Sequence, residues 1–275
     1  MTDRQPDFMI VGATKSATTW LQRNLQQHSA VFMPGTETHY FSWYFERGPA
    51  WYGAFFAPAA AHQIVGEKST SYLYHPEAAQ RLKEALPEVR LIMQLRNPIE
   101  RVWAHYCMDF RRGEVSADAD RHLRAGADAD RLRAGGLYFR HVSRFFELFS
   151  REQLCVTLYD DLDHEPASVL NRIRAHVGLA TAAGTATVEP ALPVGPLEDA
   201  GEARPAPLGG LVKPVGDGAR RRRTGAARAR PLRYPELSDT IRQGLRSYYE
   251  EDVRALSQLL ERDLSAWLAP TRAIG

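Results

Sequence analysis

The chain has little cysteine and no long hydrophobic run. Two of its 275 residues are cysteines, Cys107 and Cys155, and their spacing is not that of metal ligands. Both lie in or beside apolar stretches, which favours buried, reduced thiols over a disulfide. Because no run approaches the roughly 18 apolar residues of a transmembrane segment, no membrane span is predicted. Residues 1–7 are polar and lack the apolar core of a signal peptide, so we expect a cytoplasmic protein.

The chain also lacks a strong net charge of either sign. It has 35 Lys and Arg residues against 33 Asp and Glu residues, which gives a net charge of +2. The total charge therefore gives no reason to expect a nucleic-acid partner, and only a local cluster could favour a polyanion. No group of potential metal ligands stands out along the sequence. Its 44% hydrophobic and 25% charged residues are typical of a globular protein with a sizeable core.

What the sequence does contain is a recurring order of apolar run, polar turn and helical pattern. Strand-like runs lie at residues 8–11, 91–95 and 154–158. Apolar stripes at helical spacing lie at residues 142–149 and 169–177, and a pattern over 237–267 predicts one long helix or two consecutive ones. This alternation predicts an α/β fold, in which a central parallel sheet is flanked by helices.

Two regions interrupt this pattern within the single domain that we expect for residues 1–275. Residues 111–136 contain a charged, nearly repeated segment, which we interpret as a partly helical surface insertion. It serves either as a solvated face or as part of the entrance to a binding site. Residues 189–235 are rich in Pro, Gly and Arg and predict a basic loop.

The segment 8–21 runs from an apolar strand into a turn with one lysine and several hydroxyl groups. Lys15 follows Gly12 by three residues, which is not the spacing of the nucleoside-triphosphate loop. If a helix begins near Ala17, its free first-turn amides and its dipole favour an anion at this position. Lys15 and the hydroxyls of Thr18 and Thr19 would complete a cradle for a phosphate-like group.

Arg96 comes directly after the run 91–95, and Pro98 is well placed to begin the next helix. Ligands collect at the carboxyl edge of parallel sheets, so we expect Arg96 to share a crevice with the Lys15 turn. The guanidinium could hold a phosphate through two hydrogen bonds, or it could form a structural ion pair. The sequence leaves both interpretations open.

Glu37 and His39 lie two residues apart among aromatic side chains. Aromatic walls would desolvate the carboxylate and make it a stronger base, whereas a surface glutamate and a packing histidine are the alternatives. Further along, Lys68 could neutralise an anionic oxygen or could pair with Glu67.

Taken together and in this order, these segments resemble the sulfotransferases that use 3′-phosphoadenosine 5′-phosphosulfate (PAPS). The likeness is strongest to the branch of the heparan sulfate sulfotransferases and their bacterial relatives. It rests on residues 11–21, 37–41, 67–69, 95–101 and 136–138, with a looser match at the end of the basic loop. The resemblance implies the P-loop-like, three-layer fold of that family, with the basic loop lying over the donor site.

The resemblance also implies a set of donor-binding residues. They are Lys15, Ser16, Ala17, Thr18, Thr19, Arg96, Ala104, Tyr138 and, as alternatives within the basic loop, Arg228, Arg230 and Arg233. In this scheme the Lys15 turn holds the 5′-phosphosulfate and Arg96 holds the 3′-phosphate.

For the transfer itself, the resemblance implies that Glu37 takes the proton of an acceptor hydroxyl. Lys15, His39 and Lys68 would assist, PAP would be the nucleotide product, and no metal ion is needed. Tyr40, Phe41, Trp43 and Ser69 are the candidate acceptor contacts, since aromatic rings stack on sugars.

The acceptor expected from the resemblance is a hydroxyl of a sugar, a glycolipid or a specialised metabolite. Three alternatives stay open: a sulfotransferase acting on a phenol, a phosphoryl-transferring kinase with the same anion loop, and a non-catalytic binder of anionic polymers. The oligomeric state is also open, with a homodimer as one option.

Three positions depart from the family's usual pattern. Ala104 replaces a serine that bonds the 3′-phosphate, so a hydrogen bond to a charged group worth about 1.5–3 kcal/mol is either missing or supplied by another group. Asn97 replaces an aspartate. Ala17 replaces a glycine of the loop, and we expect its φ to be negative because alanine avoids positive values.

Overall fold

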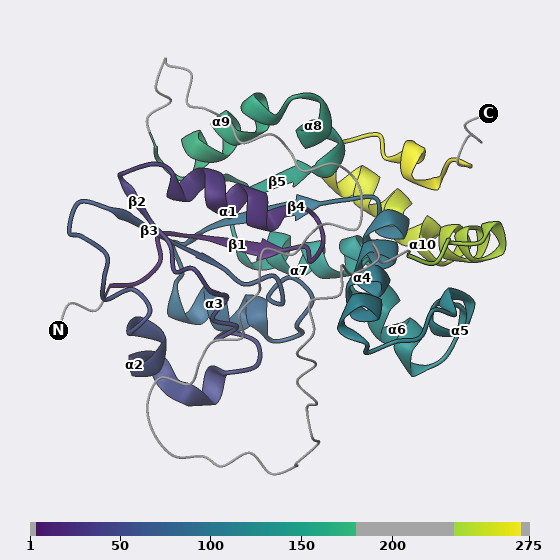
Figure 1. The fold of residues 1–275 in the computed structure, drawn as a ribbon. Helices are drawn as coiled ribbons and strands as arrows, with labels where there is room; N and C mark the ends of the chain where they lie inside the picture. Colours follow the sequence, from purple (N-terminus) through teal and green to yellow (C-terminus); the bar gives the residue numbers. More distant parts are fainter. Residues whose placement is uncertain (1–3, 180–233, 271–275) are drawn as a thin grey trace, which may run out of the picture.

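Five parallel strands form the centre of the part of the chain that the computed structural model describes, residues 4–179 and 234–270 (Figure 1). They are β1 (Phe8–Gly12), β2 (Val31–Phe32), β3 (Ile64–Lys68), β4 (Arg90–Leu95) and β5 (Leu154–Leu158). Their order in the sheet is β2-β3-β1-β4-β5, and every neighbouring pair is parallel. The prediction of an α/β fold with a central parallel sheet is confirmed.

Ten helices accompany these strands in the described residues. They are α1 (Thr18–Gln26), α2 (Gly48–Gly53), α3 (Ala78–Ala85), α4 (Pro98–Arg112), α5 (Ala119–Arg124), α6 (Ala127–Ala134), α7 (Tyr138–Leu148), α8 (Tyr159–His164), α9 (Pro166–His176) and α10 (Asp239–Leu260). Helices α1, α8 and α9 cover one face of the sheet, and α3, α4 and α7 cover the other (Figure 1). The result is the three-layer arrangement expected for the family.

Alternation along the strands explains why both faces of the sheet are covered. In β1, Phe8 and Ile10 pack into the cluster beneath α1 and α9, whereas Met9 and Val11 pack into the larger cluster on the opposite face. A strand buried on both faces reads as a continuous apolar run, which is why β1, β4 and β5 were predictable from sequence.

The sequence did not predict β2 and β3. Strand β2 has two residues, too few to form a pattern, and β3 ends in the polar sequence Gly66-Glu67-Lys68. Its central glycine is required by packing, because a Cβ on Gly66 would lie 2.2 Å from Cζ of Phe8. Strand β3 therefore packs beside β1 because Gly66 has no side chain, and an apolar side chain at this position would clash with Phe8.

The helical predictions hold, and the structure refines their bounds. Val142 and Phe145 of α7 are fully buried, as are Leu170 and Ile173 of α9. The C-terminal pattern is one 22-residue helix, α10, followed by a short 3-10 turn that buries Trp267.

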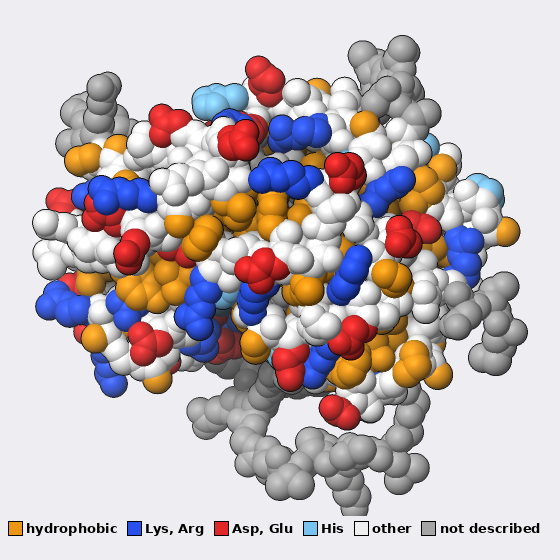
Figure 2. Space-filling model, turned by 180° about the vertical axis from the view of Figure 1, so that it is seen from behind, with side chains coloured by type: hydrophobic (Ala, Val, Ile, Leu, Met, Phe, Trp, Pro, Cys, Tyr) orange, Lys and Arg blue, Asp and Glu red, His pale blue; other side chains and the backbone are white. Residues whose placement is uncertain are grey.

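The charged segment 111–136 contains α5 and α6, and it is anchored from within. Leu123 and Leu132 are buried, and Arg131 pairs with the buried Asp109 at 2.7 Å. Most of the basic loop, together with its candidates Arg228, Arg230 and Arg233, lies outside the described residues. On the face seen in Figure 2, positive and negative side chains are interspersed, in keeping with the nearly neutral total charge.

Both cysteines are buried free thiols, as predicted. Burial raises the pKa of Cys107 to about 12 and that of Cys155 to about 11, so both thiols stay protonated at neutral pH.

Candidate active site

The parallel register brings three polar segments to one edge of the sheet. Ile10 of β1 lies opposite Lys68 at the end of β3 and opposite Ile92 of β4, so these strands end side by side. The Lys15 turn follows β1, and Arg96 follows β4. Carboxyl ends of parallel strands are the usual place for a ligand in such a sheet.

The Lys15 turn leads directly into an uncapped helix. Helix α1 begins at Thr18, close to the predicted start, and no side chain caps its first turn. Its amide dipoles therefore leave positive potential at the turn. Thr18 is buried and Thr19 is half-buried on the first turn of α1, while Ser16 is fully buried just before it.

Ala17 corrects the expectation of a negative φ. Its φ is +62° and its ψ is +23°, which is the left-handed conformation, and Lys15 two residues earlier has a φ of +66°. A left-handed alanine carries a backbone cost of about 1–2 kcal/mol, which glycine avoids. The tight turn imposes this geometry despite the alanine.

We expect Ala17→Gly to stabilise the protein by about 0.5–1 kcal/mol, because it relieves the left-handed strain at some cost in chain entropy. Urea unfolding of the variant and the parent measures the difference. Ala85→Gly, at the end of α3, is the matched control, because its helical backbone lacks that strain. A variant at position 17 that is less stable than the parent would contradict the strain argument.

Arg96 is buried, with 5% of its surface exposed, and it touches two neighbouring segments. Its Nη1 donates to the backbone oxygen of Lys15 at 3.3 Å, and its Cζ lies 4.8 Å from the centre of the Tyr159 ring. Among the described residues, Arg96 does not form the structural ion pair that was one of its two interpretations. The guanidinium is instead held against the Lys15 turn by an uncharged oxygen and a ring.

Tyr159 was missed by the sequence analysis. Its position carried a signal, because Tyr159 directly follows β5 just as Arg96 directly follows β4, at the same edge of the sheet.

At the start of α4, Asn97 accepts from the amide of Ile99 at 2.9 Å and caps the helix, and Pro98 is the first helical residue, as expected.

Two buried hydroxyls, Ser16 Oγ and Tyr138 OH, lie close to each other and near Arg96. Tyr138 is fully buried at the start of α7. Burial raises its pKa, and the nearby Arg101, Ser16 and Arg96 oppose that rise. A hydroxyl can donate to an anionic oxygen, so this pair suits a ligand with acceptor oxygens. Ala104 on α4 offers no such group, since its side chain has no polar atom.

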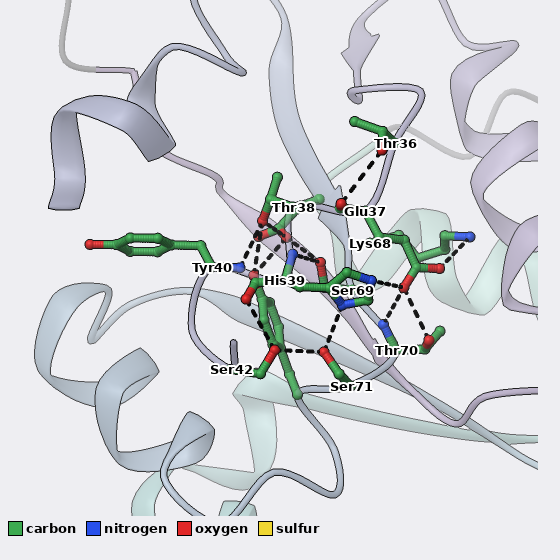
Figure 3. Close-up of polar contacts among 12 residues, drawn as sticks. Thr36, Glu37, Thr38, His39, Tyr40, Ser42, Lys68, Ser69, Thr70 and Ser71 are labelled. Atoms are coloured by element: carbon green, nitrogen blue, oxygen red, sulfur yellow. Dashed lines mark hydrogen bonds and ion pairs between the residues drawn. The ribbon is translucent and has the colours of Figure 1, made fainter. Parts of the chain in front are cut away.

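Glu37 is the centre of a second group of contacts (Figure 3). Its Oε2 accepts from the Thr70 amide at 2.9 Å and from the Thr70 hydroxyl at 3.0 Å. Its Oε1 lies 2.9 Å from Lys68 Nζ, which also donates to Thr19 Oγ1 at 3.2 Å. Lys68 thus pairs with Glu37, not with Glu67, and it joins the carboxylate to the first turn of α1.

The electrostatics of Glu37 correct the expectation of a strengthened base. Burial acts to raise its pKa, but the charges of Lys68 and His39 and the Thr70 amide outweigh burial and lower the pKa below its usual value of 4.5. The carboxylate is therefore ionised at neutral pH. Its readiness to take a proton comes from its placement rather than from desolvation.

His39 lies between Glu37 and a chain of hydroxyls. Its Nε2 is 3.6 Å from Glu37 Oε2, and its Nδ1 is 2.7 Å from Ser71 Oγ. Its ring packs against Trp43 at a tilt of 37°, with the ring centres 4.6 Å apart. Trp43 is 55% exposed, so the histidine and the tryptophan form one wall that is open to solvent.

A fully buried carboxylate, Glu67, holds this region together, and the sequence analysis did not identify its role. Its Oε1 accepts hydroxyl hydrogen bonds from Thr38, Ser69 and Tyr72 at 2.6, 2.6 and 2.8 Å, and its Oε2 accepts from Tyr52 at 2.6 Å. Ser69 Oγ in turn accepts from the amide of His39 at 2.9 Å. Glu67 therefore fixes the backbone that carries Glu37 and His39.

Replacing Glu67 with glutamine is expected to cost about 1.5 kcal/mol of stability, because the amide turns one acceptor oxygen into a donor facing a hydroxyl. Urea unfolding measures the loss, and Glu88→Gln, at an exposed glutamate, is the matched control. Equal stability of the two variants would mean that the four hydroxyls can pair elsewhere.

The candidate acceptor contacts separate into buried and exposed side chains. Tyr40 and Phe41 are 5% and 1% exposed in the core, and Tyr40 stacks on Tyr52 with ring centres 4.4 Å apart. In Figure 3 the Tyr40 side chain points away from Glu37. Ser69 is fully buried against Glu67, so Trp43 is the member of the four that faces solvent.

Two negative findings apply to residues 4–179 and 234–270. No set of three or more His, Cys, Asp or Glu side chains is arranged to hold a metal ion. No helix in these ranges combines the length and the apolar character needed to cross a membrane.

Comparison with known proteins identifies the family. The human heparan sulfate glucosamine 3-O-sulfotransferase 6 is 30% identical over 184 residues, which cover 64% of this chain and 53% of that protein. The membrane-associated sulfotransferase kil1 of Dictyostelium discoideum is 33% identical over 105 residues, covering 37% of this chain and 22% of that protein. The match thus spans about half of the length of the human relative and 22% of the length of kil1.

A solved structure agrees with the fold. The sulfotransferase from Alicyclobacillus acidocaldarius matches with a TM-score of 0.71 and 25% identity, over 97% of this chain and all of that one. The family model described as the sulfotransferase domain matches residues 5–189, more than half of the chain. The chain therefore belongs to the sulfotransferase domain family.

Proposed function

We propose that this protein transfers the sulfuryl group of PAPS to a hydroxyl group of a sugar. Membership of the sulfotransferase family supports sulfuryl transfer over the phosphoryl transfer of a kinase. The observation that carries the proposal is the placement of Glu37: a buried carboxylate paired with Lys68, which itself contacts the first turn of the anion-binding helix.

The residues at the sheet edge fit a donor with two separate anionic groups. Lys15, Ser16 and the first-turn amides of α1 would hold the 5′-phosphosulfate, which supplies the sulfuryl group when it is bound. Arg96 and Tyr138 would hold the 3′-phosphate. The fit is supported by the buried hydroxyls of Ser16 and Tyr138 near Arg96 and by the uncapped start of α1.

Glu37 would take the proton of the acceptor hydroxyl through Oε1. Two donors from Thr70 hold Oε2, whereas Oε1 lies 2.9 Å from Lys68 Nζ, which leaves Oε1 a second lone pair for an acceptor O–H. Once protonated, Glu37 no longer attracts Lys68. The ammonium can then stabilise negative charge that develops near Thr19, and such preorganised electrostatics supply much of the catalysis in group transfer.

A sugar acceptor is supported by two observations. The matched curated relative is named as an enzyme acting on heparan sulfate glucosamine. In this chain, the exposed ring of Trp43 beside His39 offers a flat apolar surface, which suits the face of a sugar ring.

The test is transfer of labelled sulfate from PAPS by the full chain to a panel of acceptors. Heparan-type oligosaccharides, glycolipids and simple phenols are compared, and binding of ATP with magnesium is measured in parallel. Transfer to sugar hydroxyls supports the proposal, and transfer to phenols alone would overturn the acceptor assignment. Saturable ATP binding with no binding of adenosine 3′,5′-bisphosphate would overturn the whole proposal.

A further inference from the structure

A closed chain of hydrogen bonds surrounds the ring of His39 on the side away from Glu37. His39 Nδ1 lies 2.7 Å from Ser71 Oγ, and Ser71 Oγ lies 2.7 Å from Ser42 Oγ. Ser42 Oγ donates to the backbone oxygen of His39 itself, at 3.1 Å. The chain is drawn in Figure 3 and joins the turn that carries Glu37 to the segment after β3.

The last link fixes the direction of the others. A serine hydroxyl has one proton, and Ser42 uses it on a carbonyl oxygen, which can only accept. For all three contacts to be hydrogen bonds at once, Ser42 must accept the proton of Ser71. Ser71 has then no proton left to donate, so it accepts from His39, and the proton on the ring lies on Nδ1.

This direction decides which nitrogen faces the reacting groups. With Nδ1 committed to Ser71, Nε2 is the ring nitrogen that faces Glu37 Oε2, at 3.6 Å. Lys68 and His39 therefore lie on two sides of Glu37, and the charge of each acts to lower the pKa of the carboxyl against the opposing effect of burial.

We propose that Ser71 and Ser42 are positioning residues of the transfer reaction, which act by holding Nδ1 of His39 protonated and presenting Nε2 to Glu37. This inference rests on the proposed function for its catalytic consequence. The ring packs against Trp43, and the hydroxyl chain opposes a ring flip that would turn Nδ1 toward Glu37. With Nε2 beside Oε2, the carboxylate keeps Oε1 directed toward the acceptor.

A mutant cycle tests whether Ser71 acts through His39. We expect Ser71→Ala to lower kcat about tenfold, which corresponds to the loss of one hydrogen bond in the transition state. KM for PAPS should stay within about twofold of the parent value. In a His39→Ala background the same change should cost less than about twofold, because its target is gone. Ser143→Ala on α7, at a half-buried serine, is the control for serine loss elsewhere.

Nitrogen-15 NMR of labelled histidine tests the geometry without turnover. The parent should show a proton on Nδ1 of His39, assigned by its loss in His39→Ala, and Ser71→Ala should shift that resonance. Ser42→Ala gives a second measurement of the same resonance if Ser71→Ala folds poorly.

Three outcomes would overturn the inference: a bare Nδ1 in the parent, unchanged kcat in Ser71→Ala, or an equal cost of Ser71→Ala in both backgrounds. Failure of the parent to transfer sulfate would instead contradict the proposed function. In that case the NMR result still decides the direction of the hydroxyl chain.

Discussion

Glu37→Gln is expected to lower kcat by about a thousandfold, within the range for losing a general base. Glutamine keeps the shape of the side chain and an oxygen for the two Thr70 donors, but its amide cannot accept the acceptor's proton. Affinity for adenosine 3′,5′-bisphosphate should stay within about twofold, because the anion-binding residues are separate from the carboxylate. Single-turnover sulfate transfer and calorimetric binding measure the two effects.

The same substitution has a pH signature in stability. The folded pKa of Glu37 lies below 4.5, its usual value, so the ionised carboxylate contributes stability above that pH. This contribution is lost as the pH falls through the folded pKa. The stability difference between parent and Glu37→Gln should therefore be constant near neutrality and shrink below about pH 4.5.

Glu88→Gln, at an exposed position, serves as the control in both measurements. Turnover of Glu37→Gln within twofold of the parent would remove Glu37 from the mechanism. A stability difference that grows on acidification would show that the sign of the pKa shift is wrong.

Arg96→Ala is expected to weaken the binding of adenosine 3′,5′-bisphosphate about a hundredfold, since one or two charged hydrogen bonds are worth about 3 kcal/mol. Arg96 is already ordered by Lys15 and Tyr159, so the parent loses little entropy on binding. Calorimetric titration measures the dissociation constants of both proteins.

The comparison ligand for Arg96 is adenosine 5′-monophosphate, which has no 3′-phosphate. If Arg96 binds that group, the variant should lose much less affinity for the monophosphate than for the bisphosphate. Arg254→Ala, at an exposed arginine paired with Glu250 on α10, controls for the loss of a positive charge. Equal losses for both ligands would indicate that Arg96 instead maintains the Lys15 turn, through its hydrogen bond to the Lys15 oxygen.

Much of the sheet was predictable because strands buried on both faces are continuous apolar runs. That signal identified β1, β4 and β5, and the rule that ligands collect at the carboxyl edge placed Lys15 and Arg96 near each other. Strand β3 was missed because its end is polar, and that polar end carries Glu67 and Lys68. The strand that supplies the site was thus the hardest to predict.

The sequence by itself determined the α/β class, the start of α1 and the chemical groups available at the site. Tertiary structure alone decided how those groups pair: Lys68 with Glu37, Glu67 with four hydroxyls, and His39 with Ser71. Periodicity follows from local burial, so it can be predicted from a short window of sequence. The partner and the pKa of a buried carboxylate depend on atoms from three segments of the chain, and only folding brings those together.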